Sequence, residues 1–224
     1  MNKNPVNDAS KIKNTHLTPR SENQRLYITA LREYDQVFAV GPAGSGKTFI
    51  PIMYALELYL KQKINKIILT RPAVEVGESH GFLPGDLTRK LAPWVIPVTE
   101  IMEEVLGKQR FIDMLKSGDF EVAPFTYMRG RTFRDAFVIL DEAQNTTEKQ
   151  MKMFLTRIGE GTKVVLSGDI DQNDMPKGRS GLTTAIKLAE KFAIPAAVIK
   201  FESKDIVRSE LCRQWVEAFD KSKI

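Results

Sequence analysis

The sequence contains too few cysteines and histidines for a disulfide framework or a structural zinc site. Its 224 residues include a single cysteine, Cys212, and two histidines. One cysteine cannot form an internal disulfide, and structural zinc sites take about four cysteine or histidine ligands. We therefore expect a protein of a reducing compartment, with a cytoplasmic location.

Long apolar runs are also missing. No stretch approaches the roughly 18 apolar residues of a membrane-spanning helix, and the opening MNKNPVNDASKIKNTH lacks the apolar core of a signal peptide. We expect no membrane partner. Residues 1–18 are polar and without periodicity, which predicts a flexible N-terminal arm, followed by one domain over 19–224.

The charge imbalance is small. Lys and Arg number 33 against 28 Asp and Glu, so the net charge is +5, which is compatible with a nucleic-acid partner without requiring one. Hydrophobic residues at 42% and charged residues at 27% are typical of a globular protein. The length fits a single domain with a substantial core.

Short β-branched or aromatic runs alternate with helical patterns along the chain. The expected strands are 36–40, 66–70, 120–125, 136–140, 163–167 and 196–201. The expected helices are about 22–33, 46–62, 86–106, 108–117, 147–159, 180–192 and 205–221, with Thr147 and Asp205 as candidate helix starts. This alternation predicts an α/β fold with a mainly parallel sheet and helices on both faces.

The segment GPAGSGKT matches the phosphate-binding pattern GxxxxGK[ST] and lies between an apolar run and a helical pattern. Its glycines let successive N–H groups face phosphates, while Lys47 adds a charge for the β and γ phosphates and Thr48 a hydroxyl for Mg²⁺. Pro51 is unusual, but its cost is small near a first helical turn. The expected nucleotide ligands here are Gly41, Pro42, Ala43, Gly44, Ser45, Gly46, Lys47 and Thr48.

Two adjacent acids end the apolar run FVIL. If this strand neighbours the one before GPAGSGKT, Asp141 faces the magnesium ion through water, and Glu142 orients or deprotonates the attacking water. A kinase would not need Glu142 in that role, so the pair favours NTP hydrolysis. The simpler alternative is an acidic strand end that caps the next helix. The next apolar run leads to SGDIDQND, where the amide of Gln172 can sense the γ-phosphate or the water.

The sequence resembles the PhoH family of P-loop ATPases, whose core is similar to the first motor domain of superfamily 1 helicases. The resemblance extends from about Asn23 to Leu211. It rests on NQRLYITAL, FAVGPAGSGKT, LTRPAVEVGESHGFLPGDL, YMRGRTF, FVILDEAQNTTEKQMKMFLTRIG, SGDIDQNDMPKGRSGL and DIVRSEL. It departs from the family pattern at Pro51 and Ser209, neither of which is an expected phosphate ligand.

The resemblance implies a single RecA-like P-loop NTPase domain and assigns further roles. Gln24 would read the adenine edge, which makes ATP the nucleotide, and Gln172 would contact the γ-phosphate. Arg208 would lie near the phosphates, with a surface position as the alternative. The expected catalytic residues are then Glu142, Lys47, Gln172 and Arg208.

Two-lobed helicases complete their ATP site with an arginine from a second lobe, for which we find no sequence here. Such an arginine is worth roughly 10³ to 10⁵ in rate. We therefore expect a homo-oligomeric ring, a hexamer by resemblance, with the site at the subunit boundary. The candidate arginines are Arg129, Arg131, Arg157 and Arg208.

The leading hypothesis is Mg²⁺-dependent ATP hydrolysis coupled to RNA or single-stranded DNA in a helicase-like manner. The expected contacts with the nucleic-acid strand are the loop from Arg71 to Leu87 and the basic residues Arg89 and Lys90. Two alternatives stay open, an ATP-controlled protein-interaction switch and an ATP-linked ribonuclease. A small-molecule kinase fits less well, given Glu142 and Gln172.

Overall fold

Six strands form one parallel sheet in the part of the chain that the structure describes. This part, in a computed structural model, comprises residues 17–72, 95–170 and 180–207 with Leu211, Gln214, Trp215 and Ala218. The strands are β1 (Gln36–Val40), β2 (Lys66–Arg71), β3 (Phe120–Pro124), β4 (Ala136–Leu140), β5 (Lys163–Gly168) and β6 (Ala197–Lys200). Their order across the sheet is β3-β2-β4-β5-β1-β6, and every neighbouring pair is parallel.

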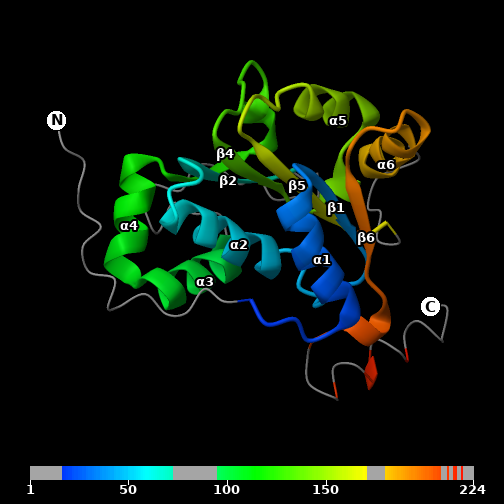
Figure 1. The fold of residues 1–224 in the computed structure, drawn as a ribbon, viewed down its shortest axis with the longest axis horizontal. Coiled ribbons are helices and arrows are strands. Elements are labelled where there is room, and N and C mark those ends of the chain that lie inside the picture. The colour runs from blue at the N-terminus through cyan, green and yellow to red at the C-terminus, as the bar shows by residue number, and fades with distance from the viewer. Residues whose placement is uncertain are drawn as a thin grey trace, which may run out of the picture.

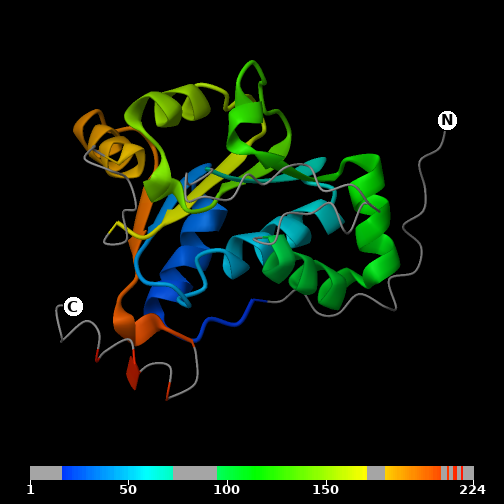
Figure 2. The ribbon, with the colours of Figure 1, turned by 180° about the vertical axis from the view of Figure 1, so that it is seen from behind.

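Helices cover both faces of this sheet (Figures 1 and 2). One face carries α1 (Glu22–Glu33), α2 (Phe49–Leu60), α3 (Ile96–Leu106) and α4 (Lys108–Ser117), and the other carries α5 (Glu148–Leu155) and α6 (Gly181–Lys191). The described residues also include three short 3₁₀ helices: η3 (Phe125–Met128), η4 (Ala143–Asn145) and η5 (Ser203–Asp205). The expected α/β architecture with helices on both faces is confirmed.

The central strands are apolar at nearly every position because both sides of the sheet are buried. In β1, Val37 and Ala39 belong to the core beneath α1 to α4, whereas Phe38 and Val40 belong to the core beneath α5 and α6. Successive side chains of a strand point to opposite faces, so this alternation follows from the pleat. Because all neighbouring strands are parallel, the carboxyl ends of all six strands lie at one edge of the sheet.

Two helix starts follow the expected chemistry. Ser21 accepts the Gln24 N–H at the start of α1, and Thr147 forms a reciprocal capping box with Gln150 at the start of α5. However, α5 ends at Leu155, before the predicted residue 159. The chain after it turns back, and the Arg157 carbonyl and the Gly159 N–H bond to the backbone of Phe133.

Asp205 was wrongly predicted to open a helix. It ends η5, where its carboxylate accepts the Glu202 N–H at 2.8 Å and the Asn23 side-chain amide at 2.7 Å. Bonds to a neighbouring backbone N–H and to α1 hold the side chain in a local turn instead of a cap for the following segment. The described residues Leu211, Gln214, Trp215 and Ala218 further along are helical.

Strand β5 lies between β1 and β4, so the expectation that the FVIL strand neighbours the phosphate-loop strand was wrong. Asp141 nevertheless comes close to the loop, because β5 ends in the small residues Ser167 and Gly168. The Ser167 hydroxyl donates to Asp141 Oδ1 at 2.9 Å. The intervening strand thus forms part of the site.

Pro51 is the third residue of α2, where its ring is tolerated but its missing N–H has a consequence. The helical bonds of the residues on either side follow the usual pattern, so an N–H at position 51 would have reached the Lys47 carbonyl. That carbonyl instead accepts the hydroxyl of fully buried Tyr27 at 3.1 Å. Burial raises the pKa of the Tyr27 hydroxyl well above its usual range, with Asp141 as the second cause, so the group remains a donor.

We expect Tyr27→Phe to lower the free energy of unfolding by about 1 to 2 kcal/mol, because it leaves the Lys47 carbonyl without its donor. In a Pro51→Ala background the new N–H replaces that donor, so the same substitution should cost about 1 kcal/mol less. Urea unfolding of the four proteins measures this coupling, with the exposed Tyr34→Phe as control. Strictly additive effects of the two substitutions would contradict the assignment.

Candidate functional site

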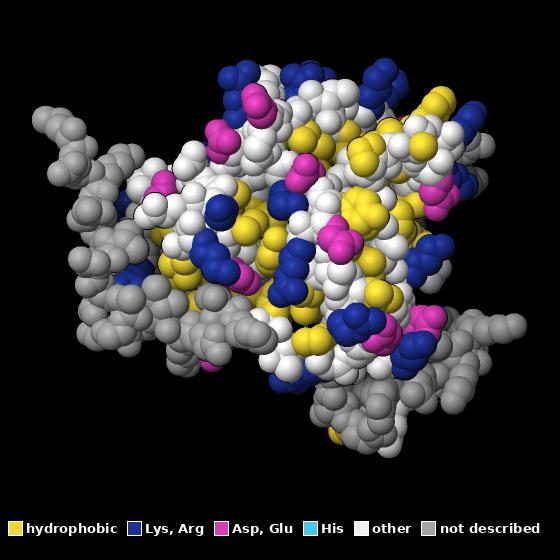
Figure 3. All heavy atoms as spheres, viewed as in Figure 1, with side chains coloured by type: hydrophobic (Ala, Val, Ile, Leu, Met, Phe, Trp, Pro, Cys, Tyr) yellow, Lys and Arg dark blue, Asp and Glu magenta, His cyan; other side chains and the backbone are white. Residues whose placement is uncertain are grey.

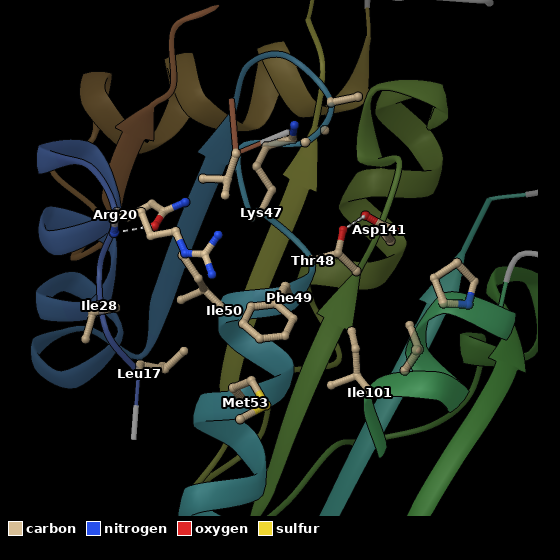
Figure 4. A pocket seen from close by; sticks show the side chains of 18 of the residues that line it. Leu17, Arg20, Ile28, Lys47, Thr48, Phe49, Ile50, Met53, Ile101 and Asp141 are labelled. Atoms are coloured by element: carbon tan, nitrogen blue, oxygen red, sulfur yellow. Dashed lines mark hydrogen bonds between the residues drawn. The ribbon is translucent and has the colours of Figure 1, made fainter. Parts of the chain in front are cut away.

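A cavity of about 660 Å³ lies where the carboxyl edge of the sheet meets α1, α2 and α3 (Figure 4). This volume is in the range of small-molecule sites, about 300 to 1,000 Å³. Its polar end contains Lys47, Thr48, Asp141, Glu142 and Asp169. Its apolar end is lined by Leu17, Ile28, Phe49, Ile50, Met53, Pro97, Val98 and Ile101. The cavity thus has a charged end and an apolar end, which suits a ligand with one charged and one apolar part.

The loop between β1 and α2 has the backbone shape that its glycines predict. Gly41, Gly44 and Gly46 have φ values of +135°, +83° and +94°. These values strain residues with a Cβ, and a Cβ on Gly41 would also lie 2.4 Å from the Phe201 carbonyl oxygen. Buried Ser45 fixes the loop by donating to the Pro42 carbonyl at 2.9 Å. The loop starts α2 directly, so α2 begins at Phe49 and not at the predicted residue 46.

Lys47 folds back over its own loop. Its ammonium donates to the Pro42 carbonyl at 2.7 Å and lies 3.5 Å from the Ser45 hydroxyl. Burial lowers the pKa of Lys47 below its usual range, whereas Asp169, Asp141 and Glu142 act in the opposite direction. The lysine is therefore a partly desolvated cation, and this desolvation strengthens its attraction to an anionic ligand, whereas the three carboxylates oppose such a ligand.

Thr48 and Asp141, the two residues expected to hold magnesium, lie in contact in the wall of the cavity. The Thr48 hydroxyl donates to Asp141 Oδ1 at 3.1 Å (Figure 4). Ser167 donates to the same oxygen at 2.9 Å. A hydroxyl and a carboxylate are hard oxygen ligands, and Mg²⁺ typically takes only one or two protein ligands beside phosphates and water. These residues fit Mg²⁺. Among the described residues, no group of three or more His, Cys, Asp or Glu side chains forms an all-protein metal site.

Glu142 is held in a fixed orientation at the cavity wall. Its backbone is left-handed, with φ of 50° and ψ of 39°, which is unusual for a residue with a long side chain. One carboxylate oxygen accepts the Gln144 amide at 2.6 Å, and the other lies 3.6 Å from an Arg71 guanidinium nitrogen. Its carboxylate thus lines the cavity with one contact at each oxygen.

The amide of Gln24 is buried and bound on both sides. It accepts the Arg20 N–H at 2.9 Å and donates to the Ser45 carbonyl at 2.9 Å. Gly46 leaves room for it, since a Cβ there would lie 3.2 Å from the amide nitrogen. Gln24 thus joins the segment before α1 to the phosphate-binding loop. Its second N–H and second lone pair leave the predicted adenine contact open.

Several predicted residues lie outside the described part of the chain, namely Gln172, Arg208, Arg89 and Lys90. The other candidate arginines have different surroundings. Arg131 pairs with Glu121 through two hydrogen bonds and lies over the Phe133 ring, so it is committed within its own domain. Arg157 is half-buried, and Arg129 is exposed.

Sequence reasoning missed Ser167 and assigned Arg71 to a loop that contacts nucleic acid, although both belong to the surroundings of this site. Ser167 supports Asp141, and Arg71 pairs with Glu142. A serine at a strand end carries no chemical signal of its own. Arg71 is the last residue of β2, which lies beside β4. Its contact with Glu142 could therefore have been predicted only if the strand order had been known.

None of the described helices is both long enough and apolar enough to cross a bilayer.

Comparison with solved structures supports the fold. The large terminase of a thermophilic bacteriophage superimposes with a TM-score of 0.51 at 13% identity, covering 89% of this chain and 50% of that one. This level of similarity concerns the fold alone. With the sheet, helices and loop described above, it supports a RecA-like P-loop fold.

Sequence comparison is more specific. A PhoH-like protein of Bacillus subtilis (strain 168) is 47% identical over 203 residues, which cover 90% of this chain and 63% of that protein. Protein PhoH of Escherichia coli (strain K12) is 44% identical over 203 residues, covering 89% and 57%. The chain thus spans about three fifths of the length of these relatives. The family described as PhoH-like protein matches residues 16–220, and this chain belongs to that family.

Proposed function

We propose that the protein hydrolyses ATP with the help of Mg²⁺. The observation that carries the proposal is the meeting of Thr48 and Asp141 at 3.1 Å beside Glu142, next to a phosphate-binding loop. Such an arrangement would supply a hydrolase with a metal-binding pair and a carboxylate for the water at one end of the nucleotide. A site that only bound nucleotide would not need Glu142 held from two sides.

Each residue has a role that follows from its position. The loop N–H groups and Lys47 would bind the phosphates, Thr48 and Asp141 would hold the metal, and Glu142 would orient or deprotonate water. Mg²⁺, when bound, neutralises charge on the β and γ phosphates. Gln24 would contact adenine at the other end, in keeping with the resemblance to helicases, and would make the enzyme prefer ATP.

We infer further that the site works at a boundary between subunits of a ring. Of the described candidate arginines, Arg129 is the exposed one, whereas Arg131 is paired with Glu121. Leu188 in α6 and Phe192 and Ile194 just after it are exposed apolar residues. Figure 3 shows apolar surface in the region of α6, of the kind that a neighbouring subunit would cover. An oligomer completed by an arginine in trans should lose ATPase rate per subunit on dilution, and a rate independent of dilution would argue against it.

RNA or single-stranded DNA is the proposed coupling partner. The support is the helicase-like motif set of the sequence and the net charge of +5. We expect either polymer to raise the ATPase rate at low salt, with binding that weakens by a log-log slope of about 0.7 per phosphate contact. The test is ATPase and binding measurements with RNA, single-stranded DNA and neither, over a series of salt concentrations. If neither polymer binds nor stimulates, the coupling is wrong while the ATPase proposal stands.

A further inference from the structure

The side chain of Gln144 connects the ends of two strands at the site. Its amide nitrogen donates to Glu142 Oε2 at 2.6 Å, and its amide oxygen accepts the Asp169 N–H at 3.1 Å. Gln144 is only 1% exposed. One buried amide thus joins the carboxylate that follows β4 to the backbone that follows β5.

The chemistry fixes which way this amide points. A backbone N–H can only donate, so the atom that faces Asp169 must be the amide oxygen. The amide nitrogen is then left to donate to the Glu142 carboxylate, which can only accept when ionised. Each end of the amide therefore meets the one partner with which it can bond.

The surroundings of Gln144 hold it in this position. Its own carbonyl accepts the hydroxyl of Ser180, the residue before α6, at 2.9 Å. Gly168 faces the side chain, and a Cβ there would lie 2.5 Å from the amide oxygen. Within the described part of the chain, the side-chain and carbonyl groups of Gln144 thus bond to Glu142, to Asp169 after β5 and to Ser180 before α6. None of these partners belongs to the phosphate-binding loop.

Glu142 depends on this support because its side chain is partly exposed and its other contact is longer. Its side chain is 35% exposed, and its second contact, with Arg71, is an ion pair at 3.6 Å, longer than a hydrogen bond. The short bond from Gln144 is the closer of the two. Small displacements of a catalytic group cost large factors in rate, about 10² for 1 Å.

We propose that Gln144 is a positioning residue, which aims the Glu142 carboxylate at the attacking water and makes that aim depend on the end of β5. The inference rests on the proposed ATPase function and adds a residue to it. In the sequence, β5 is followed by Asp169 and then by Gln172. A displacement of the backbone at Asp169 would therefore be transmitted to the Glu142 carboxylate through the Gln144 amide. Gln144 should therefore affect turnover and leave nucleotide binding alone.

Three variants test the proposal in the full chain. Gln144→Met keeps the size and removes both bonds, and Gln144→Glu keeps an acceptor for Asp169 but turns a carboxylate oxygen toward Glu142. Gln144→His retains one donor and one acceptor. We expect kcat to fall about 10- to 100-fold in the first two, with KM for ATP and Kd for a non-hydrolysable ATP analogue within about 2-fold of wild type. The histidine variant should recover a substantial part of the rate.

The controls separate this inference from the function on which it rests. Gln62→Glu, an exposed glutamine away from the cavity, should keep the wild-type rate. If wild type hydrolyses ATP and Glu142→Gln does not, but Gln144→Met turns over normally, only the positioning role is overturned. A parallel loss of rate and nucleotide affinity in all three variants, without recovery by histidine, would mean a structural role and would also overturn it. A wild type without ATPase activity overturns both proposals.

Discussion

Replacing Glu142 with glutamine is expected to lower kcat by about 10² to 10⁴ while nucleotide binding persists, the range attributed to positioned acid-base groups. The substitution keeps the length and hydrogen-bonding reach of the side chain and removes its basicity. Thr48 and Asp141, which would hold the metal, are untouched, as is the phosphate-binding loop. The loss should therefore appear in turnover, with Kd for ATP changed by less than about 3-fold.

The measurement pairs steady-state ATPase rates with equilibrium binding of ATP to the slow variant. Glu160→Gln serves as the matched control, because Glu160 is exposed and does not line the cavity. A Glu142→Gln protein that turns over at the wild-type rate would remove the proposed base. One that loses ATP binding would place Glu142 in nucleotide binding instead.

The elements could be read from the sequence more completely than their arrangement. All six strands and the helices α1 to α6 were predicted, though not the three 3₁₀ helices, because a strand buried on both faces is a continuous apolar run and a surface helix has a polar side. The strand order was not accessible in the same way. Each central strand has apolar residues on both faces, so nothing in FVIL or KVVLSG indicates which of them lies beside β1.

The same limit explains which site residues were found. Lys47, Thr48, Asp141 and Glu142 belong to contiguous motifs whose chemistry can be recognised locally. Ser167 acquires its role only because β5 is inserted beside Asp141. The bond from Tyr27 to the loop likewise depends on the contact between α1 and α2, which no local pattern in the sequence indicates.

We expect Lys47→Met to abolish stabilisation by Mg²⁺-ATP and to leave the unliganded protein at least as stable as wild type. A ligand at 100 times its Kd stabilises the native state by about 2.7 kcal/mol, so wild type should show a clear rise in Tm. The substitution removes the ammonium charge that would face the phosphates.

The unliganded protein should tolerate the change because the ammonium is partly desolvated, as the lowered pKa of Lys47 indicates. Methionine keeps a flexible chain of similar length and removes that desolvation cost. It forgoes the bond to the Pro42 carbonyl, worth about 1 kcal/mol, and the attraction to nearby carboxylates. These opposing effects are of similar size, so Tm without nucleotide should change little or rise.

Thermal unfolding with and without Mg²⁺-ATP measures both parts of this prediction at once. Lys152→Met, an exposed lysine of α5 outside the cavity, is the matched control and should keep the full shift in Tm. A Lys47→Met protein that ATP still stabilises as wild type would show that the loop N–H groups suffice for binding. Lys47 would then act only on the reacting phosphate, and its loss would appear in kcat alone.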